Sequence, residues 1–323
     1  MNDREVFANR VPIVDVGALI RGEYVAKNLA LLRQTVEQAG FVYVTNHGIP
    51  SSLISNVREN ARVFFHQPEA TKREVSISKH HRGWLAAGGA QMSQDEPSDM
   101  KESFIWGATA DAERNADHSL RGPNQWPDEC VRDMSKHGQA WFECAEGLAR
   151  SLLTGLAVAY GLDADYFLKS SDRGLSRASC VFYPSERSSS GLTDQFGVGA
   201  HTDFGVLTVL SQDSVGGLQV EVSKNEWVDV PPIDDALIIN VGDLLHRWTD
   251  GRMRSAPHRV VRPTEVDRLS VVFAYDPNPE TVIDAAEFRS KGVDGPNAIT
   301  CGEYLDARFS QAFAYRTEVR RFD

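Results

Sequence analysis

The chain has 323 residues, of which 41% are hydrophobic and 24% are charged, and its formal net charge at pH 7 is −11. A chain of this length and composition can bury a full-sized core, so intrinsic disorder is excluded as its general state. The negative charge repels phosphate backbones and anionic lipid, so we expect neither a nucleic-acid nor a membrane partner.

The four cysteines lie far apart and form no CxxC pair, which argues against a zinc knuckle and against a disulfide framework. The N-terminal residues lack a basic stretch followed by an apolar one, and no window approaches the roughly 18 apolar residues of a membrane span. We therefore expect a cytoplasmic protein with reduced thiols and no processed leader. The oligomeric state is left open.

Strands and helices alternate in the first half of the chain, as judged from apolar spacing, β-branched runs and terminal Ser, Gly and Pro residues. The expected elements are a strand within 11–20, a helix over 26–40 ending at Gly40, a strand within 41–50, a helix over 51–68 with Ser51 and Ser52 as candidate N-caps, and a long helix over 132–160 capped by Gly161.

Residues 79–122 break this pattern with Gly, Ser, Asp, Pro and scattered aromatic residues. A long irregular stretch inside a compact protein is often a functional lid. A tolerated surface insertion explains the composition equally well, so both interpretations stand.

After Ser176 the sequence changes to short strands separated by turn residues, which indicates a β-sandwich or barrel with helices packed on the outside of one sheet. The expected strands lie within 177–184, 204–213, 216–222, 226–232, 236–243, 258–263 and 268–277, and residues 300–316 return to helix.

A histidine and an aspartate two residues apart, His201 and Asp203, begin the apolar run HTDFGVLTVL. Residues i and i+2 of a strand point to the same face, so we expect the imidazole and the carboxylate side by side, as two ligands of a metal ion. An HxD triplet arises by chance in roughly one chain in three of this length. The pair therefore indicates a metal site only if a third ligand joins it.

His258 is the best candidate for that third ligand, because it opens a strand of alternating character and the upstream TDG turn can return this strand to the sheet. Two strands from opposed sheets would then direct the three side chains at one point. Two imidazoles and one carboxylate leave about three coordination positions open, which suits non-haem Fe(II) oxygen chemistry. A zinc hydrolase is the competing interpretation, although the sequence contains no HExxH pairing.

Ten residues after His258, the motif RLS places Arg268 and Ser270 on one strand face. A guanidinium beside a hydroxyl is well suited to bind a carboxylate in a dry pocket, through parallel charge-assisted hydrogen bonds. Taken alone, the pair is better explained as an ordinary surface pair of a strand.

Together these motifs resemble the isopenicillin N synthase-like family of Fe(II)/2-oxoglutarate-dependent dioxygenases. The resemblance is carried by the segments GFVYVTNHGIP, HTDFGVLTVLSQDSVGGLQV, INVGDLLHRWTDGRMRSAPHRVV and RLSVVFAY, which occur in the family's order over nearly the whole chain. The combination HxD…H…RxS is far more specific than any of its parts.

The resemblance implies an enzyme that oxidises a C–H bond of a small molecule by hydroxylation, desaturation or cyclisation. The oxidant is O2, and 2-oxoglutarate is the cosubstrate, which leaves as succinate and CO2. His201, Asp203 and His258 would bind the Fe(II) cofactor.

The resemblance also assigns the cosubstrate. Arg268 and Ser270 would hold the distal carboxylate of 2-oxoglutarate, and Tyr183 matches a tyrosine that helps to hold it in many relatives. The family usually has an asparagine two residues before this tyrosine, but Val181 occupies that place here.

The implied fold is mainly β with flanking helices around a double-stranded β-helix, the cupin-like jelly roll. We expect one dioxygenase domain over residues 1–323. Its parts are a mostly helical N-terminal region at 1–175 with a lid at about 79–122, a jelly-roll catalytic core at 176–280 and a C-terminal helical segment at 281–323.

Substrate contacts are expected from the lid segment and from the strand that carries the RxS motif. An arginine beside a tryptophan in a lid would suit a planar or anionic substrate, whereas a solvated loop anchored by two buried aromatic residues is the competing interpretation. The candidates are Arg82, Trp84, Phe104, Trp106, Phe273 and Tyr275.

Two alternatives share the predicted scaffold. An oxidase that needs no 2-oxoglutarate would use Arg268 to hold a substrate carboxylate. A jelly-roll binding protein without catalysis would not need the three metal ligands, so the intact HxD…H set argues against it.

Overall fold

The computed structural model describes residues 11–92, 98–112, 118–186, 196–289, 298–313 and 315–316. Within these ranges no helix combines the length with the apolar composition that a bilayer crossing requires.

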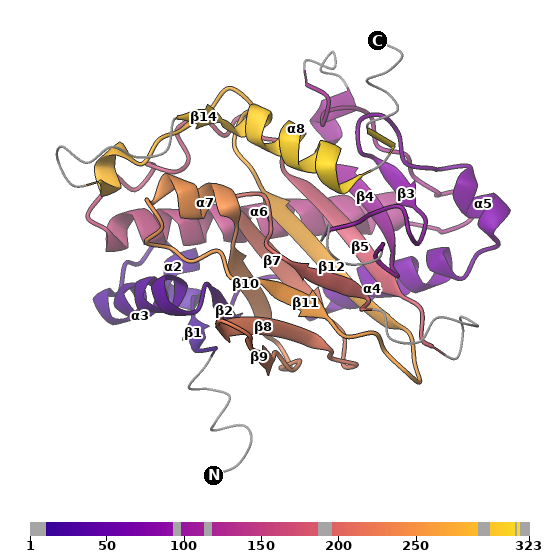
Figure 1. Ribbon diagram of the computed structural model, residues 1–323, viewed down its shortest axis with the longest axis horizontal. Helices are drawn as coiled ribbons and strands as arrows, with labels where there is room; N and C mark the ends of the chain where they lie inside the picture. The colour runs from indigo at the N-terminus through magenta and orange to yellow at the C-terminus, as the bar shows by residue number, and fades with distance from the viewer. Residues whose placement is uncertain are drawn as a thin grey trace.

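Two β-sheets form the centre of the molecule (Figure 1). The larger sheet has the strand order β1-β2-β10-β7-β12-β5-β4-β3, and the smaller sheet has the order β6-β11-β8-β9. All pairs in both sheets are antiparallel except β1 with β2. The bounds are β1 Ile13–Asp15, β2 Phe41–Thr45, β3 Gly83–Leu85, β4 Glu102–Gly107, β5 Arg177–Tyr183, β6 Val198–His201, β7 Leu207–Gln212, β8 Leu218–Ser223, β9 Glu226–Asp229, β10 Leu237–Val241, β11 His258–Val260 and β12 Arg268–Tyr275. A ribbon of β13 (Val282–Ile283) and β14 (Ile299–Thr300) forms a third, two-stranded sheet.

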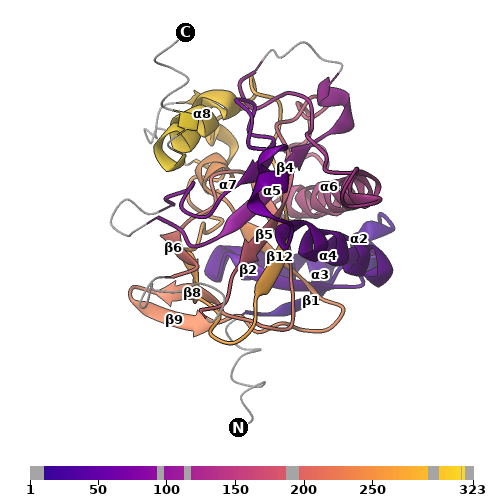
Figure 2. The ribbon, with the colours of Figure 1, turned by 90° about the vertical axis from the view of Figure 1, so that its right-hand side faces the viewer.

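Helices from the first half of the chain cover the outer face of the larger sheet, whereas the smaller sheet and the later helices lie on its other side (Figure 2). The helices are α2 Gly17–Ile20, α3 Ala26–Gln38, α4 Ser51–Phe65, α5 Glu69–Arg73, α6 Met134–Ala159, α7 Asp243–Trp248 and α8 Cys301–Ala312, with short 3-10 turns at Thr109–Ala112 and Ala286–Phe288. The long apolar face of α6 packs against α3, α4 and the central strands β7, β12 and β5. This arrangement confirms the predicted jelly-roll core with flanking helices.

Most predicted elements of the first half are present, with their ends close to the predicted positions. Gly40 follows α3 with a φ of 69°, and Gly161 follows α6 with a φ of 72°, a backbone conformation that glycine adopts without strain. The predicted N-cap of α4 is wrong. Pro50 is the N-cap with an extended backbone, and Ser51 is already the first helical residue.

The N-terminal region supplies both edges of the larger sheet, because β1 and β2 form one edge and β3 and β4 form the other. The prediction that the segment 79–122 is irregular throughout is therefore wrong, since β4 pairs with β5 over six residues. Residues 93–97 and 113–117 of that segment lie outside the described residues, as do 290–297, 314 and 317–323 of the C-terminal segment. Side chains from both halves share one apolar core between the helices and the sheet.

Candidate metal and cosubstrate site

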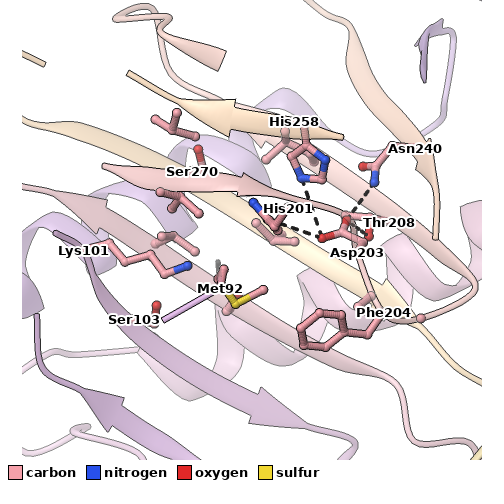
Figure 3. A pocket seen from close by; sticks show the side chains of 18 of the residues that line it. Met92, Lys101, Ser103, His201, Asp203, Phe204, Thr208, Asn240, His258 and Ser270 are labelled. Atoms are coloured by element: carbon pink, nitrogen blue, oxygen red, sulfur yellow. Dashed lines mark hydrogen bonds and ion pairs between the residues drawn. The ribbon is translucent and has the colours of Figure 1, made fainter. Parts of the chain in front are cut away.

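A cavity of about 190 Å³ lies between the two sheets, and strands from both contribute to its wall. It brings together all six of the metal- and cosubstrate-binding residues predicted from sequence: His201, Asp203, His258, Arg268, Ser270 and Tyr183. Figure 3 shows part of this wall, with the candidate metal ligands at one side, Ser270 toward the other, and the Lys101 side chain extending from the far side toward the ligands.

The three candidate metal ligands converge at strand ends. His201 is the last residue of β6 and His258 the first of β11, and the two residues pair directly across the antiparallel ladder. The Oδ1 atom of Asp203 lies 4.0 Å from Nε2 of His201 and 3.7 Å from Nε2 of His258. One ligand atom from each residue falls within 4.8 Å of the others, which is close enough for a single ion.

The route by which these ligands meet differs from the prediction. Asp203 does not share a strand face with His201, because β6 ends at His201 and Asp203 lies in the loop before β7. The two histidines come from neighbouring strands of one sheet and not from opposed sheets. The histidine of the HxD motif therefore ends a strand, and the aspartate belongs to the loop that follows it.

Hydrogen bonds orient each ligand atom. The Nδ1 atoms of His201 and His258 lie 2.8 and 3.2 Å from the carbonyl oxygens of Gly199 and Ala256. These carbonyls can only accept, so each Nδ1 carries the proton and each Nε2 presents its lone pair to the shared space.

The carboxylate of Asp203 is held in the same way by two residues that the sequence analysis missed. Thr208 Oγ1 and Asn240 Nδ2 donate to its Oδ2 at 2.5 and 2.7 Å (Figure 3). Oδ1 is left facing the imidazoles. Both donors occupy inward-facing positions of strands next to the ligand loop, and strand alternation is the signal that would have found them.

Burial and the nearby His258 lower the pKa of His201 to about 3. Burial alone raises the pKa of Asp203, but the two histidines and the hydrogen bonds from Thr208 and Asn240 outweigh it and lower the pKa to about 2. At neutral pH the site therefore holds a neutral His201 and an ionised Asp203. These are the protonation states that bind metal.

The loop that carries Asp203 is held against the start of α7. The amides of Gly242, Asp243 and Leu244 donate to the carbonyls of Val206, Asp203 and Gly205, at 2.7–3.0 Å. A Cβ atom at Gly242 would overlap the Gly205 carbonyl, and one at Gly205 would overlap the Asp276 carboxylate. The motif VGD therefore fixes the position of the metal loop.

Replacing Gly205 with alanine is expected to weaken Fe(II) binding about 10- to 100-fold and to lower the melting temperature, because the new methyl group must displace the loop that carries Asp203. Gly147→Ala, on α6, is the matched control, since no described atom lies within 4 Å of a Cβ built there. The control should raise stability slightly and leave iron affinity unchanged. Anaerobic iron titration with thermal unfolding checks both, and equal iron affinities in the two variants would contradict the role of Gly205.

The second half of the site lies where β12 pairs with β5. Arg268 pairs with Tyr183 across the ladder, and its guanidinium carbon lies 4.7 Å from the centre of the Tyr183 ring. The Nε atom of Arg268 donates to the carbonyl of Gly216 at 2.5 Å. Among the described residues, Nη1 of Arg268 and Oγ of Ser270 are buried and have no hydrogen-bond partner.

Arg268 differs from the other deeply buried arginines in its charge balance. Arg82 lies 3.1 Å and Arg121 3.6 Å from the carboxylate of Asp111. Arg268 is 1% exposed, yet no carboxylate of the described residues forms an ion pair with it. An unpaired buried cation is costly, so this guanidinium is arranged for a ligand that supplies the missing negative charge.

None of the six residues that were predicted to contact the substrate lines the cavity. Arg82 is ion-paired to Asp111, and the five aromatic residues belong to the core on the helix side of the sheet. The physical reason is strand alternation. With Arg268 and Ser270 facing inward, Phe273 and Tyr275 must face outward, and on β4 the same rule turns Phe104 and Trp106 outward.

The inward positions of the same strands were missed. They are Ser103 and Ile105 on β4, Arg177, Ser179 and Val181 on β5, and Val272 and Ala274 on β12. Other segments complete the wall with Phe41, His81, Met92, Phe204, Phe309 and Phe313. Every second residue counted from Arg268 along β12, and from Tyr183 along β5, is predicted to face the cavity. This rule gives the cavity-lining residues of those two strands but not those of the other segments.

Two family models match the chain: "non-haem dioxygenase in morphine synthesis N-terminal" over residues 11–129 and "2OG-Fe(II) oxygenase superfamily" over residues 175–277. Among curated relatives, the 2-oxoglutarate-dependent dioxygenase gloF of Glarea lozoyensis is 33% identical, with 88% of this chain and 92% of the relative covered. Validamycin A dioxygenase of Streptomyces hygroscopicus subsp. limoneus is 29% identical over 91% and 84%.

Solved structures agree with these matches. A full-length protein of Neurospora crassa, crystallised in complex with alpha-KG, aligns with a TM-score of 0.81 at 27% identity, covering 93% of this chain and 96% of that one. The two imidazoles, the carboxylate and the unpaired Arg268 with Ser270 fit Fe(II) and a dicarboxylic oxoacid. The chain therefore belongs to the 2OG-Fe(II) oxygenase superfamily and is an Fe(II)- and 2-oxoglutarate-dependent dioxygenase.

Proposed function

We propose that His201, Asp203 and His258 hold the Fe(II) ion and that Arg268 and Ser270 hold the distal carboxylate of 2-oxoglutarate. The observation that carries this assignment is the buried guanidinium of Arg268, which has no carboxylate partner among the described residues, in the same cavity as the three ligands. A carboxylate there would receive hydrogen bonds from Nη1 of Arg268 and Oγ of Ser270, both of which are unpaired.

Tyr183 supports Arg268, whereas the resemblance suggests that it helps to hold 2-oxoglutarate itself. Its ring packs on the guanidinium of Arg268. This contact fixes the plane of the guanidinium and covers one of its faces, so Tyr183 acts as a positioning residue for Arg268.

Bound iron and 2-oxoglutarate supply the oxidation of a C–H bond at the expense of cosubstrate decarboxylation. The residues of the chain do the rest. Thr208 and Asn240 keep Asp203 aimed at the ion, and the apolar side chains of Val181, Leu218 and Val272 exclude water from the space between the ion and Arg268.

The charges in the cavity indicate the class of substrate. Fe(II) and Arg268 would carry three positive charges, and Asp203 and 2-oxoglutarate three negative ones. The other two cations in the wall are paired within the protein: Lys101 with Asp99 at 3.1 Å and Arg177 with Asp276 at 2.6 Å. A substrate with a net charge would stay uncompensated in this buried space, so we infer that the substrate is uncharged or zwitterionic.

The shape and lining of the cavity restrict the substrate further. The cavity volume of about 190 Å³ must also admit 2-oxoglutarate, which favours a small molecule. The wall around Arg177 contains the aromatic rings of Phe204, Phe309 and Phe313, which suit a flat molecule with polar edges. The same Neurospora crassa protein, solved with alpha-KG and thymine, shares the fold at a TM-score of 0.80 and 27% identity. A small, uncharged, planar ring is therefore the first class of substrate to screen.

The test is a screen of O2 consumption by the Fe(II)-loaded protein, with 2-oxoglutarate and panels of uncharged planar rings, amino acids and monocarboxylates. We expect one uncharged or zwitterionic compound to accelerate succinate release, with one succinate per substrate oxidised. Substrate oxidation that proceeds equally well without 2-oxoglutarate would overturn the cosubstrate assignment. Acceleration confined to anionic compounds would overturn the substrate class.

We infer a cytoplasmic location, as expected from the sequence. The four cysteines are all free thiols in the structure, which suits a reducing compartment.

A further inference from the structure

We propose that Lys101 binds the second carboxylate of 2-oxoglutarate, the one beside the ketone, in place of the asparagine that this chain lacks at Val181. The inference rests on the proposed function, because it assumes that Arg268 holds the distal end of the same molecule.

The positions of the two residues carry the first step. Val181 on β5 pairs with Ser103 on β4, and both side chains line the cavity. Lys101 lies immediately before β4, two residues ahead of Ser103, and its side chain also lines the cavity. A long side chain from the neighbouring strand can thus reach the space in front of Val181, where a short amide would stand in a typical relative.

The surroundings of the ammonium group carry the second step. The side chain of Lys101 is 13% exposed and that of its ion-pair partner Asp99 is 1% exposed. An ammonium group has three N–H donors, and Asp99 is its one polar partner among the described residues. Figure 3 shows the side chain reaching into the cavity, with its amino group directed toward the side of Met92 and His201. At least one donor is therefore available to a ligand in the cavity.

The charge on Lys101 is secured by Asp99. Burial works against the charged form, but Asp99, with smaller contributions from Tyr183 and Asp203, outweighs it and raises the pKa of Lys101. The ammonium group therefore stays protonated at neutral pH and can donate to an anion.

Asp99 also fixes the position of this charge relative to the candidate metal site. Its Oδ1 accepts from the amide of Gly199 at 3.4 Å, and the carbonyl of Gly199 holds Nδ1 of His201 at 2.8 Å. The ammonium group and the imidazole are thus tied to the same residue of β6.

A purely structural ion pair explains these observations less well. The neighbouring wall is apolar at Met92, Ile105 and Val181, and a buried ion pair is often no more stable than apolar residues of similar volume. A pair built only for stability also has no need to place its cation in the cavity.

The test is an anaerobic titration of the Fe(II)-loaded protein with 2-oxoglutarate, following the visible absorption band that forms on chelation. The main variant is Asp99→Asn with Lys101→Met, because Lys101→Met alone would leave Asp99 buried and unpaired. We expect Kd for 2-oxoglutarate to rise about 10- to 100-fold, the loss expected for one charge-assisted hydrogen bond, with Fe(II) affinity unchanged.

A rescue variant makes the test specific. Adding Val181→Asn to the double variant should recover most of the lost affinity, because it restores the amide donor on β5. Should the double variant not fold, Lys101→Gln keeps a polar contact to Asp99 and is expected to raise Kd about 3- to 10-fold.

A Kd within about twofold of wild type in these variants, or no recovery with Val181→Asn, would overturn the proposal. Arg268→Met is the reference that separates this outcome from failure of the proposed function. If that variant also binds 2-oxoglutarate as wild type does, the cosubstrate site itself has been misplaced. If it loses binding while the Lys101 variants do not, only the role of Lys101 fails.

Discussion

Replacing Asp203 with alanine is expected to weaken Fe(II) binding more than 100-fold and to reduce succinate formation to background. Asp203 is the one anionic member of the proposed ligand set, and its Oδ1 faces both imidazoles. Without it, two neutral ligands would face a divalent ion in a buried cavity, and the charge of the ion would be poorly compensated. Loss of an outer-shell partner alone typically costs about 10- to 100-fold in metal affinity, so loss of a ligand should cost more. Anaerobic iron titration and a succinate assay measure the two effects.

Thr208→Val is the graded control for this variant. It keeps the carboxylate but removes the hydrogen bond from Thr208 Oγ1 to Oδ2, so iron affinity should fall about 10- to 100-fold. Thermal unfolding of both variants tests whether the fold persists. Turnover of the wild-type order in Asp203→Ala would mean that the metal ion binds elsewhere.

The strands of the catalytic half could be predicted because each combines a β-branched run with flanking turn residues. All seven expected strands after Ser176 are present, and none of their ends differs from the prediction by more than three residues. The strands β6, β13 and β14 were missed, the last two in a segment that was expected to be helical. The sequence of β6 (Val198–His201), VGAH, is short and carries few β-formers, although the strand ends at a candidate metal ligand. Its pairing with β11, at long sequence separation, decides its conformation.

The two strands β3 and β4 were missed for the same kind of reason. Gly, Ser and Asp residues around them suggested a loop, but β4 is stabilised by pairing with β5, more than 70 residues later in the chain. Local propensity does not report such a partner.

The candidate metal and cosubstrate residues were predictable because their residue types are rare in apolar strands and their spacing is specific. The substrate wall was not, since size and aromatic character were given more weight than strand alternation. Phe273 and Tyr275 are large but face the helices, whereas the smaller Val272 and Ala274 face the cavity. Asp243 lies in one of the segments that carry the resemblance, but its role in holding the Asp203 loop was not predicted, because that role depends on backbone contacts between distant segments.

Replacing Arg268 with methionine is expected to have opposite effects on ligand binding and on stability. Affinity for 2-oxoglutarate should fall more than about 100-fold, because the cation that faces the distal carboxylate is lost. The melting temperature of the ligand-free protein should rise, because a buried cation without a carboxylate partner among the described residues is replaced by an apolar side chain of similar length. Thermal unfolding with Fe(II), with and without 2-oxoglutarate, measures both effects under anaerobic conditions.

Arg82→Met is the matched control, since Arg82 is equally buried but is ion-paired to Asp111 and does not line the cavity. Its loss should lower the melting temperature, because Asp111 loses a partner. The rise caused by 2-oxoglutarate should persist, because at 100 times Kd a ligand adds about 2.7 kcal/mol to the free energy of unfolding. Arg268→Met should show the reverse pattern, a higher starting temperature and no rise with ligand. If both variants lose stability and both keep the rise, Arg268 is an ordinary structural arginine, and the carboxylate of 2-oxoglutarate must be bound by another group.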